Sequence, residues 1–145
     1  MKIYFACSIT GGREFESVYQ VITQALAEDS HDVPTAHLAD PGVMSLESII
    51  DPLEVYARDI AWIRDSEALI AEVSVPSHGV GYEIGYALGL GKPVLAVHQE
   101  GRRVSKMISG NPDPNLLVLA YINPVHAVEI VRKFLDKQPS REQRH

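Results

Sequence analysis

The chain has 145 residues, of which 46% are hydrophobic and 22% charged, and its formal net charge is −6. This length suffices for one domain with a proper core and is too short for two. An acidic chain without a basic run argues against binding to nucleic acid polymers, which needs clustered Lys and Arg on phosphates. A small anionic ligand stays compatible with this charge, because loop amides and helix N-termini bind phosphate.

The cysteine count and the hydropathy of the sequence indicate in which cellular compartment the protein works. Cys7 is the only cysteine, which excludes a disulfide framework and a cysteine-based zinc site. No apolar run approaches the roughly 20 residues of a membrane helix. The N-terminal "MKIYFACSI" leads directly into an apolar strand, without a cationic leader. We therefore expect a cytoplasmic protein that does not associate with membranes.

Strand and helix patterns alternate from the N-terminus onward. Nearly continuous apolar runs predict strands covered on both faces, and apolar residues at helical spacing predict the helices between them. The predicted elements are a strand at 2–9, a helix at 17–29, a weak strand at 31–34, a loop at 36–48, a helix at 52–67, a strand at 68–74, a helix at 81–91, a strand at 92–98, a short turn or helix at 102–110, a strand at 115–121 and a helix at 124–137.

This alternation predicts an α/β fold: a single-domain, Rossmann-like (flavodoxin-like) five-stranded parallel sheet with helices on both faces. The domain spans residues 1–137, and residues 138–145 form a polar C-terminal tail. In such folds ligands bind beyond the carboxyl ends of the strands. The segments "CSITGGRE", "SVPSHGVGYE" and "HQEGRRVS" follow the first, third and fourth strands, so we expect them to meet at one edge.

Glu83 lies where the third strand gives way to a helix, behind Ser77, Gly79 and Gly81. The helix dipole favours a carboxylate in the first turn, typically by ~0.3–1 kcal/mol, and this field is expected to keep it ionised at neutral pH. An ionised carboxylate suits a nucleophile or a base. The alternative is an ordinary glutamate that completes a helix N-terminus. Its place at the ligand edge, beside a glycine-bearing loop, favours the functional interpretation.

The turn "SITGGRE" has free amides at Gly11 and Gly12 that could hold a phosphate. Its spacing is neither that of the Rossmann fingerprint nor that of the P-loop. Many tight turns use paired glycines only for their backbone freedom. Arg13 could pair with an anion, although an exposed arginine at this position is usually solvated.

Asp59 shares a helix face with Trp62 and Ile63. A carboxylate beside such side chains is a candidate for a raised pKa through desolvation. The alternative is a boundary residue paired with Arg58 or Arg64, and the residues alone favour that alternative.

The six histidines show no metal-ligand spacing, and no Ser-His-Asp or Cys-His set is recognisable. We therefore expect no metal site. His37, in the loop after the second predicted strand, could reach the ligand edge. Cys7 is interpreted first as a small buried packing residue.

Three segments taken together, "YFACSITGGRE", "DIAWIRDSEALIAEVSVPSHGVGYEIGYA" and "RRVSKMISG", resemble the nucleoside 2-deoxyribosyltransferase superfamily, and most closely its 2′-deoxynucleoside 5′-phosphate N-hydrolase branch. The resemblance runs from Lys2 to about Asp136. It implies a retaining N-glycosidase that converts (2′-deoxy)nucleoside 5′-monophosphates to free base and (deoxy)ribose 5-phosphate, without a cofactor. Glu83 matches the family nucleophile, Asp59 the second acid, and Tyr4 a tyrosine that orients the pair.

The resemblance also implies how the substrate is held. Ser77 and Gly79 match the loop that binds the 5′-phosphate, and Ser105 matches a serine supplied by a second subunit, which implies a homodimer. The remaining substrate contacts that it implies, around the nucleotide and over its base or sugar, are Cys7, Ile9, Thr10, Gly11, Arg13 and His37.

The chain departs from the branch at Cys7 and Thr10, where the branch reads Gly and Arg in "GSIRGGRE". The missing arginine removes a cation near the phosphate or the base, which Arg13 or Arg102 could replace. Phosphate dependence, base preference and the 2′ position of the sugar therefore stay open. Two alternative functions also remain: a transferase that exchanges bases, and a nucleotide-binding sensor without turnover.

Overall fold

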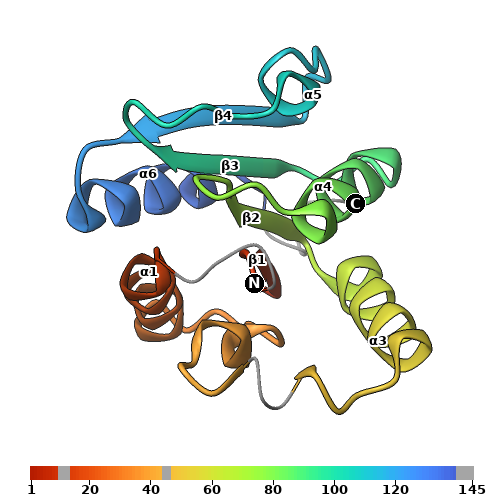
Figure 1. Cartoon of the computed structure of the whole chain (residues 1–145). Coiled ribbons are helices and arrows are strands. Elements are labelled where there is room, and N and C mark those ends of the chain that lie inside the picture. Colours follow the sequence, from red (N-terminus) through yellow and green to blue (C-terminus); the bar gives the residue numbers. More distant parts are fainter. Residues whose placement is uncertain (10–13, 44–46, 140–145) are drawn as a thin grey trace.

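The computed structural model describes residues 1–9, 14–43 and 47–139. Figure 1 shows its helices and strands, with helices on both sides of one sheet. The elements are β1 (Ile3–Ala6), α1 (Glu16–Glu28), the 3-10 helix η1 (Ala36–Ala39), α3 (Pro52–Asp65), β2 (Ala68–Glu72), α4 (His78–Gly89), β3 (Val94–Gln99), α5 (Lys106–Ser109), β4 (Leu116–Tyr121) and α6 (Pro124–Asp136).

The sheet is parallel throughout, with the strand order β1-β2-β3-β4. This confirms the α/β class and the parallel sheet, but the prediction of five strands is wrong. The predicted strand at 31–34 contributes one isolated bridge between Lys2 and Asp32, in which Ile3 N donates to Asp32 O at 2.8 Å. Pro34 has no N–H for a sheet ladder, and the chain turns there toward η1, so the pairing does not extend.

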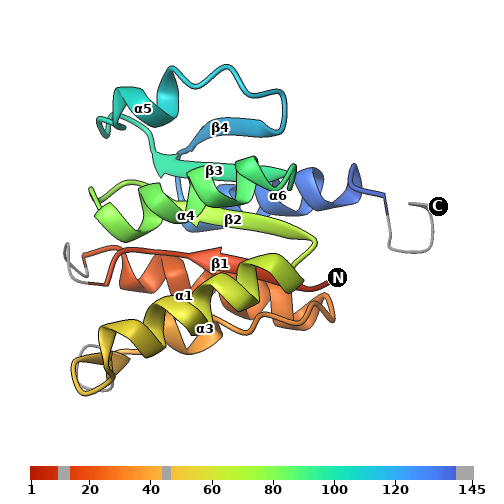
Figure 2. The same cartoon turned by 90° about the vertical axis from the view of Figure 1, so that its right-hand side faces the viewer.

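The helices cover the sheet in two layers, which Figure 2 shows with α3 and α4 in front of the sheet and α1 and α6 behind it. Side chains alternate between the faces of a strand. In β1, Ile3 and Phe5 belong to the core cluster under α1 and α6, whereas Tyr4 and Ala6 belong to the cluster under α3 and α4. Tyr4 is therefore directed toward the layer that carries Asp59 and Glu83.

Both helices of that layer begin at a side-chain cap. Asp51 caps α3 by accepting a hydrogen bond from Leu53 N at 2.8 Å, with Pro52 in the first turn. Ser77 caps α4 through Val80 N at 3.3 Å, so the helix begins at His78 and not at Gly81 as expected. Glu83 consequently lies in the second turn of α4 and not in the first, where the sequence predicts it.

At the C-terminus, α6 ends at Asp136, close to the predicted boundary, and residues 140–145 of the expected tail lie outside the described residues. Across the part of the chain that the structure describes, no helix has the length and apolarity needed to cross a bilayer.

Candidate active site

A cavity of about 650 Å³ opens where β1 ends, between the first halves of α3 and α4. Cys7 and Ile9, which follow β1, form one part of its wall. Three acidic side chains reach it from three different segments, namely Glu47, Asp59 and Glu83. The rest of the wall is largely apolar and includes Ile50, Val55 and Ile60. The cavity therefore combines carboxyl groups with an apolar lining.

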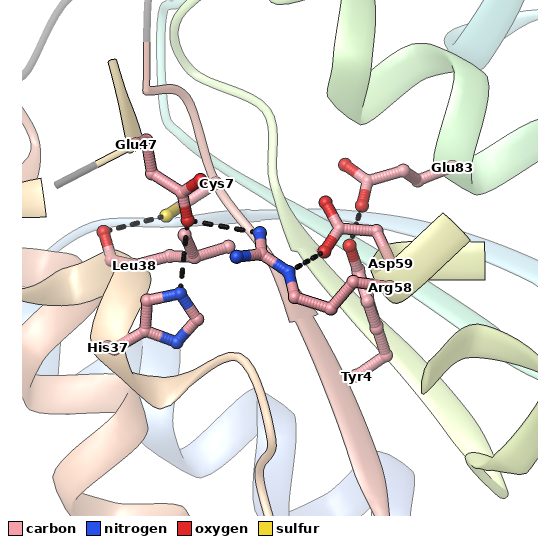
Figure 3. A network of polar contacts seen from close by, with 8 residues as sticks. All are labelled: Tyr4, Cys7, His37, Leu38, Glu47, Arg58, Asp59 and Glu83. Carbon is pink, nitrogen blue, oxygen red and sulfur yellow. Dashed lines mark hydrogen bonds and ion pairs between the residues drawn. The ribbon is translucent and has the colours of Figure 1, made fainter. Parts of the chain in front are cut away.

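Glu83 is held by a residue of the sheet. Tyr4 is fully buried, and its hydroxyl donates a hydrogen bond to Oε2 of Glu83 (Figure 3). Burial raises the pKa of Glu83 to about 8. The Tyr4 hydroxyl acts in the opposite sense, because it donates to the ionised form. The expectation that the helix dipole keeps Glu83 ionised is not met, since that effect fades beyond the first turn and Glu83 lies in the second.

Asp59 lies on α3 and lines the same cavity as Glu83. Its Oδ1 accepts a hydrogen bond from Nε of Arg58 at 2.9 Å. Burial raises the pKa of Asp59, and the Arg58 guanidinium partly offsets that rise. Asp59 therefore pairs with Arg58, as one interpretation of the sequence expects, and it also lines the cavity.

A further set of contacts surrounds Arg58. Its Nη2 donates to Oε1 of Glu47 at 3.0 Å, and Nε2 of His37 is 3.1 Å from the same oxygen (Figure 3). The guanidinium lies 4.9 Å above the ring of Trp62, and His37 packs edge-on against that ring at 5.9 Å. His37 thus contacts Glu47 and does not itself line the cavity.

Glu47 and the Tyr56–Tyr82 pair were not predicted as parts of the site. Glu47 comes from a stretch that reads as irregular loop, and nothing in its neighbourhood in the sequence marks it. Tyr56 and Tyr82 lie at the cavity with half-exposed rings, edge to face at 6.2 Å, and their hydroxyl oxygens are 3.2 Å apart. The signal that could have indicated Tyr82 is its place directly before Glu83.

The predicted phosphate loop lies at the cavity as well. Ser77 and Gly79 both line it at the N-terminus of α4. A Cβ atom built on Gly79 would lie 3.9 Å from Oγ of Ser77 and 4.0 Å from Oε1 of Glu83. Backbone amides at a helix N-terminus and a carboxyl oxygen therefore approach the same small volume.

The residues predicted around the first strand divide into two groups. Cys7 and Ile9 line the cavity, and Cys7 is a buried thiol whose Sγ donates to Leu38 O at 3.7 Å. Thr10, Gly11 and Arg13 lie outside the described residues.

Ser105 does not lie at this cavity within one chain. It is exposed, and its hydroxyl caps the short helix α5 by accepting from Met107 N at 3.2 Å. It lines a second hollow of about 1080 Å³ between α4 and residues 103–111. Ser77 and Tyr82 line both spaces, so the two adjoin at the first half of α4.

Among the residues with described positions, no group of three or more His, Cys, Asp or Glu side chains is arranged to hold a metal ion. The arrangement that is present, a tyrosine-held glutamate and an aspartate in one cavity at the carboxyl end of a parallel sheet, is that of an α/β enzyme site suited to acid–base or nucleophilic chemistry.

The chain belongs to the nucleoside 2-deoxyribosyltransferase family, and residues 3–129 match the sequence model of that family. The resemblance noted in the sequence is thereby confirmed. A protein of Methanosarcina mazei, provisionally named 2′-deoxynucleoside 5′-phosphate N-hydrolase 1, is 43% identical over 134 residues, which cover 92% of this chain and 83% of the relative. The 5-hydroxymethyl-dUMP N-hydrolase of Mus musculus is 41% identical over 116 residues, which cover 77% of this chain and 66% of the relative.

Among solved structures, the CMP N-glycosidase BcmB of Clostridium botulinum is similar, with a TM-score of 0.70 and 18% sequence identity. The match covers 92% of this chain and 99% of that one. At this identity the similarity establishes the fold that the two proteins share.

Proposed function

We propose that the protein is an N-glycosidase that hydrolyses the N-glycosidic bond of (2′-deoxy)nucleoside 5′-monophosphates, releasing the free base and (deoxy)ribose 5-phosphate. Family membership supports this proposal, as do the names of the relatives in M. mazei and mouse. The observation that carries it is the hydrogen bond from Tyr4 to Glu83 beside a cavity that Asp59 also lines.

In the first step, Oε1 of ionised Glu83 attacks C1′ of the sugar while Tyr4 holds Oε2 in place. A glycosyl ester forms, the N-glycosidic bond breaks, and its electron pair moves to the nitrogen of the base. Protonated Asp59 gives its proton to the leaving base.

In the second step, Asp59 is ionised and takes a proton from a water molecule that attacks C1′. The ester bond breaks, and Glu83 leaves as a carboxylate. Two displacements at C1′ retain its configuration. The cycle starts with one proton on the carboxyl pair, located on Asp59, and with Glu83 ionised. Because burial raises the pKa of Glu83 to about 8, this reactive form is the minor one in the free protein at neutral pH. The Tyr4 donor favours that distribution, because it stabilises the ionised form of Glu83.

The walls of the cavity suggest how the substrate lies. The apolar side chains of Ile50, Val55 and Ile60 suit the faces of a base. The amides that follow Ser77 at the N-terminus of α4, a helix of 12 residues, suit the 5′-phosphate. This orientation brings C1′ between the two ends, close to Glu83.

The proposal includes a homodimer in which Ser105 of a second copy reaches the phosphate. The exposure of Ser105, and the hollow that adjoins the cavity at α4, support this part of the proposal. It further includes a catalytic domain at residues 1–137 with a polar tail at 138–145, working in the cytoplasm. Ser105→Ala is expected to raise the KM for monophosphates by roughly 10-fold and to leave that for unphosphorylated nucleosides unchanged; an equal effect on both excludes Ser105 from phosphate binding.

The function is tested by incubating the protein with the ribo- and 2′-deoxyribonucleoside 5′-monophosphates of the common bases, together with the matched nucleosides, and separating released base by chromatography. We expect base release from at least one monophosphate, with a loss of 10²-fold or more in Glu83→Gln, in line with removal of a nucleophile or a general acid or base. Full turnover in folded Glu83→Gln, or no release from any compound, rejects the proposal.

A second candidate, base exchange, is favoured by the description of the family as transferases. Adding a competing free base to the reaction separates the two activities. A transferase forms a new nucleoside or nucleotide that carries the added base, whereas a hydrolase forms only the free sugar phosphate.

A further inference from the structure

Arg58 joins two acidic side chains of the cavity. Its Nε donates to Oδ1 of Asp59 at 2.9 Å, and its Nη2 donates to Oε1 of Glu47 at 3.0 Å (Figure 3). The three side chains are largely buried, with exposed fractions of 23% for Arg58, 18% for Asp59 and 10% for Glu47. Ion pairs shielded from water in this way are screened less by salt than exposed pairs are.

The bond between Arg58 and Asp59 is not a routine pair on a helix surface. Successive residues of a helix point about 100° apart, so neighbours at i and i+1 do not face each other. Helix geometry alone therefore does not bring the Arg58 guanidinium to Asp59. The guanidinium also lies over the ring of Trp62 and donates to the carboxylate of Glu47, and these two contacts hold it in place. Two groups outside the pair therefore determine where the guanidinium meets Asp59.

We propose that Arg58 is a positioning residue, which sets the orientation and the protonation of Asp59 and fastens the Glu47 segment to the cavity wall. This inference rests on the proposed function, in which Asp59 first donates and then accepts a proton. Arg58 donates to Oδ1 of Asp59, so Oδ2 is the oxygen that transfers the proton. The guanidinium also stabilises the ionised Asp59 that forms once its proton has passed to the base.

The charges around Asp59 come from several elements. Arg58 lies beside it on α3, and Glu47 and His37 reach the network from the chain between α1 and α3. Glu83 faces the same cavity from α4, and the hydroxyl of Tyr4 in β1 is hydrogen-bonded to it. Desolvation and Glu47 raise the pKa of Asp59, whereas Arg58 and His37 lower it. Removal of Arg58 therefore raises this pKa further, and the limb of the pH–rate profile that Asp59 governs moves to higher pH.

The kinetic test is a double-mutant cycle of Arg58→Gln and Asp59→Asn, with Arg64→Gln as the matched control. Arg64 lies on the same helix, but it contacts Tyr86, outside the cavity lining. On the 2′-deoxynucleoside monophosphate that the wild type hydrolyses fastest, Arg58→Gln should lower kcat roughly 10-fold, a part of the effect of an acid–base group. In the Asp59→Asn background the same change should alter kcat less than about 2-fold, because coupled residues are not additive. An equal loss in both backgrounds, or unchanged kcat, overturns the inference.

A second measurement needs no turnover. The carboxyl group of Asp59 is titrated by ¹³C NMR in the wild type, Arg58→Gln and Arg64→Gln. Its pKa is expected to rise only in Arg58→Gln, and an unchanged value overturns the inference. The two proposals fail differently: full activity of Asp59→Asn rejects the assigned site, whereas an inactive Asp59→Asn beside an unaffected Arg58→Gln rejects only the role of Arg58.

Discussion

The hydroxyl of Tyr4 donates a hydrogen bond to Oε2 of Glu83, so the first strand of the sheet orients a carboxyl group that belongs to α4. Tyr4→Phe removes this donor to the ionised form, and the pKa of Glu83, which burial raises to about 8, should then rise further. A nucleophile must be ionised, so the acidic limb of kcat/KM should move to higher pH and the rate at pH 7 should fall roughly 10-fold.

The measurement is kcat/KM between pH 5.5 and 9.5 for the wild type and Tyr4→Phe. Tyr86→Phe is the matched control, since Tyr86 lies on α4 but outside the cavity lining. An acidic limb that stays in place in Tyr4→Phe contradicts this prediction.

Glu83 should reduce the stability of the fold at neutral pH. Its pKa is about 8 in the folded protein and near 4.5 when unfolded, so between these values only the folded state binds the proton. Stability therefore falls as the pH rises from about 4.5 to about 8. Glu83→Gln removes this loss, and its advantage in Tm over the wild type should be small at pH 4.5 and reach roughly 10 °C at pH 8.

Thermal melts of the wild type and Glu83→Gln across this pH range test the point, with Glu129→Gln, an exposed site on α6, as the control. A gain in Tm that does not depend on pH would show that the ionisation of Glu83 is not its cause.

A methyl group at Gly79 should leave the stability of the fold intact but lower the activity. A Cβ atom there meets Ser77 Oγ at 3.9 Å and Glu83 Oε1 at 4.0 Å, both ordinary contact distances. Alanine also favours the helix over glycine by up to about 1 kcal/mol. Gly79→Ala should therefore keep or raise the Tm. The methyl group occupies the volume beside Oε1, so kcat/KM should fall roughly 10-fold or more.

The matched control is Gly89→Ala, because Gly89 lies on the same helix with no atom near an added Cβ and outside both cavities. Equal kcat/KM in Gly79→Ala and the wild type would mean that substrate does not approach this face of Glu83.

A second buried acid, Glu72, should matter for stability. It is fully buried at the end of β2 and accepts hydrogen bonds from Tyr121 Oη, Ser74 N at 2.7 Å and Ser74 Oγ at 2.9 Å. Gln99 N donates to that same serine hydroxyl at 2.8 Å, so the ends of β2, β3 and β4 are joined. Glu72→Ala leaves these donors without an acceptor and should cost about 3 kcal/mol of unfolding free energy.

Urea unfolding of Glu72→Ala, with Glu129→Ala as an exposed control, measures this cost. A loss below about 1 kcal/mol would show that water or a rearranged serine replaces the carboxylate at little cost.

The strands of the sheet were predictable, because strands buried on both faces need nearly continuous apolar runs, as in Ile3–Ala6 and Ala68–Glu72. The segment 31–34 was mispredicted as a strand, since a short run ending at Pro34 has no partner for its ladder beyond Asp32. The start of α4 was also misjudged, because the capping hydroxyl of Ser77 outweighed the low helix propensity of the glycines after it.

Less of the site than of the fold could be predicted from the sequence. Residue patterns alone indicated Glu83, whereas Asp59 and Tyr4 gained weight only through the family resemblance. Tyr4 sits in an apolar strand and reads as a core residue until the face of the sheet that it occupies is known. Glu47 depends on contacts with Arg58 and His37, and no local pattern encodes such contacts.

The contact between Tyr4 and Glu83 spans 79 positions of the chain. A nascent polypeptide consequently has no working site until α4 has been synthesised and docked, because distant segments must first overcome the entropy of loop closure. Fraying of the N-terminal strand would likewise abolish turnover, because it removes Tyr4 from Glu83 while most of the sheet remains intact. Turnover in this protein should therefore report the integrity of its first strand more sensitively than a global melting curve does.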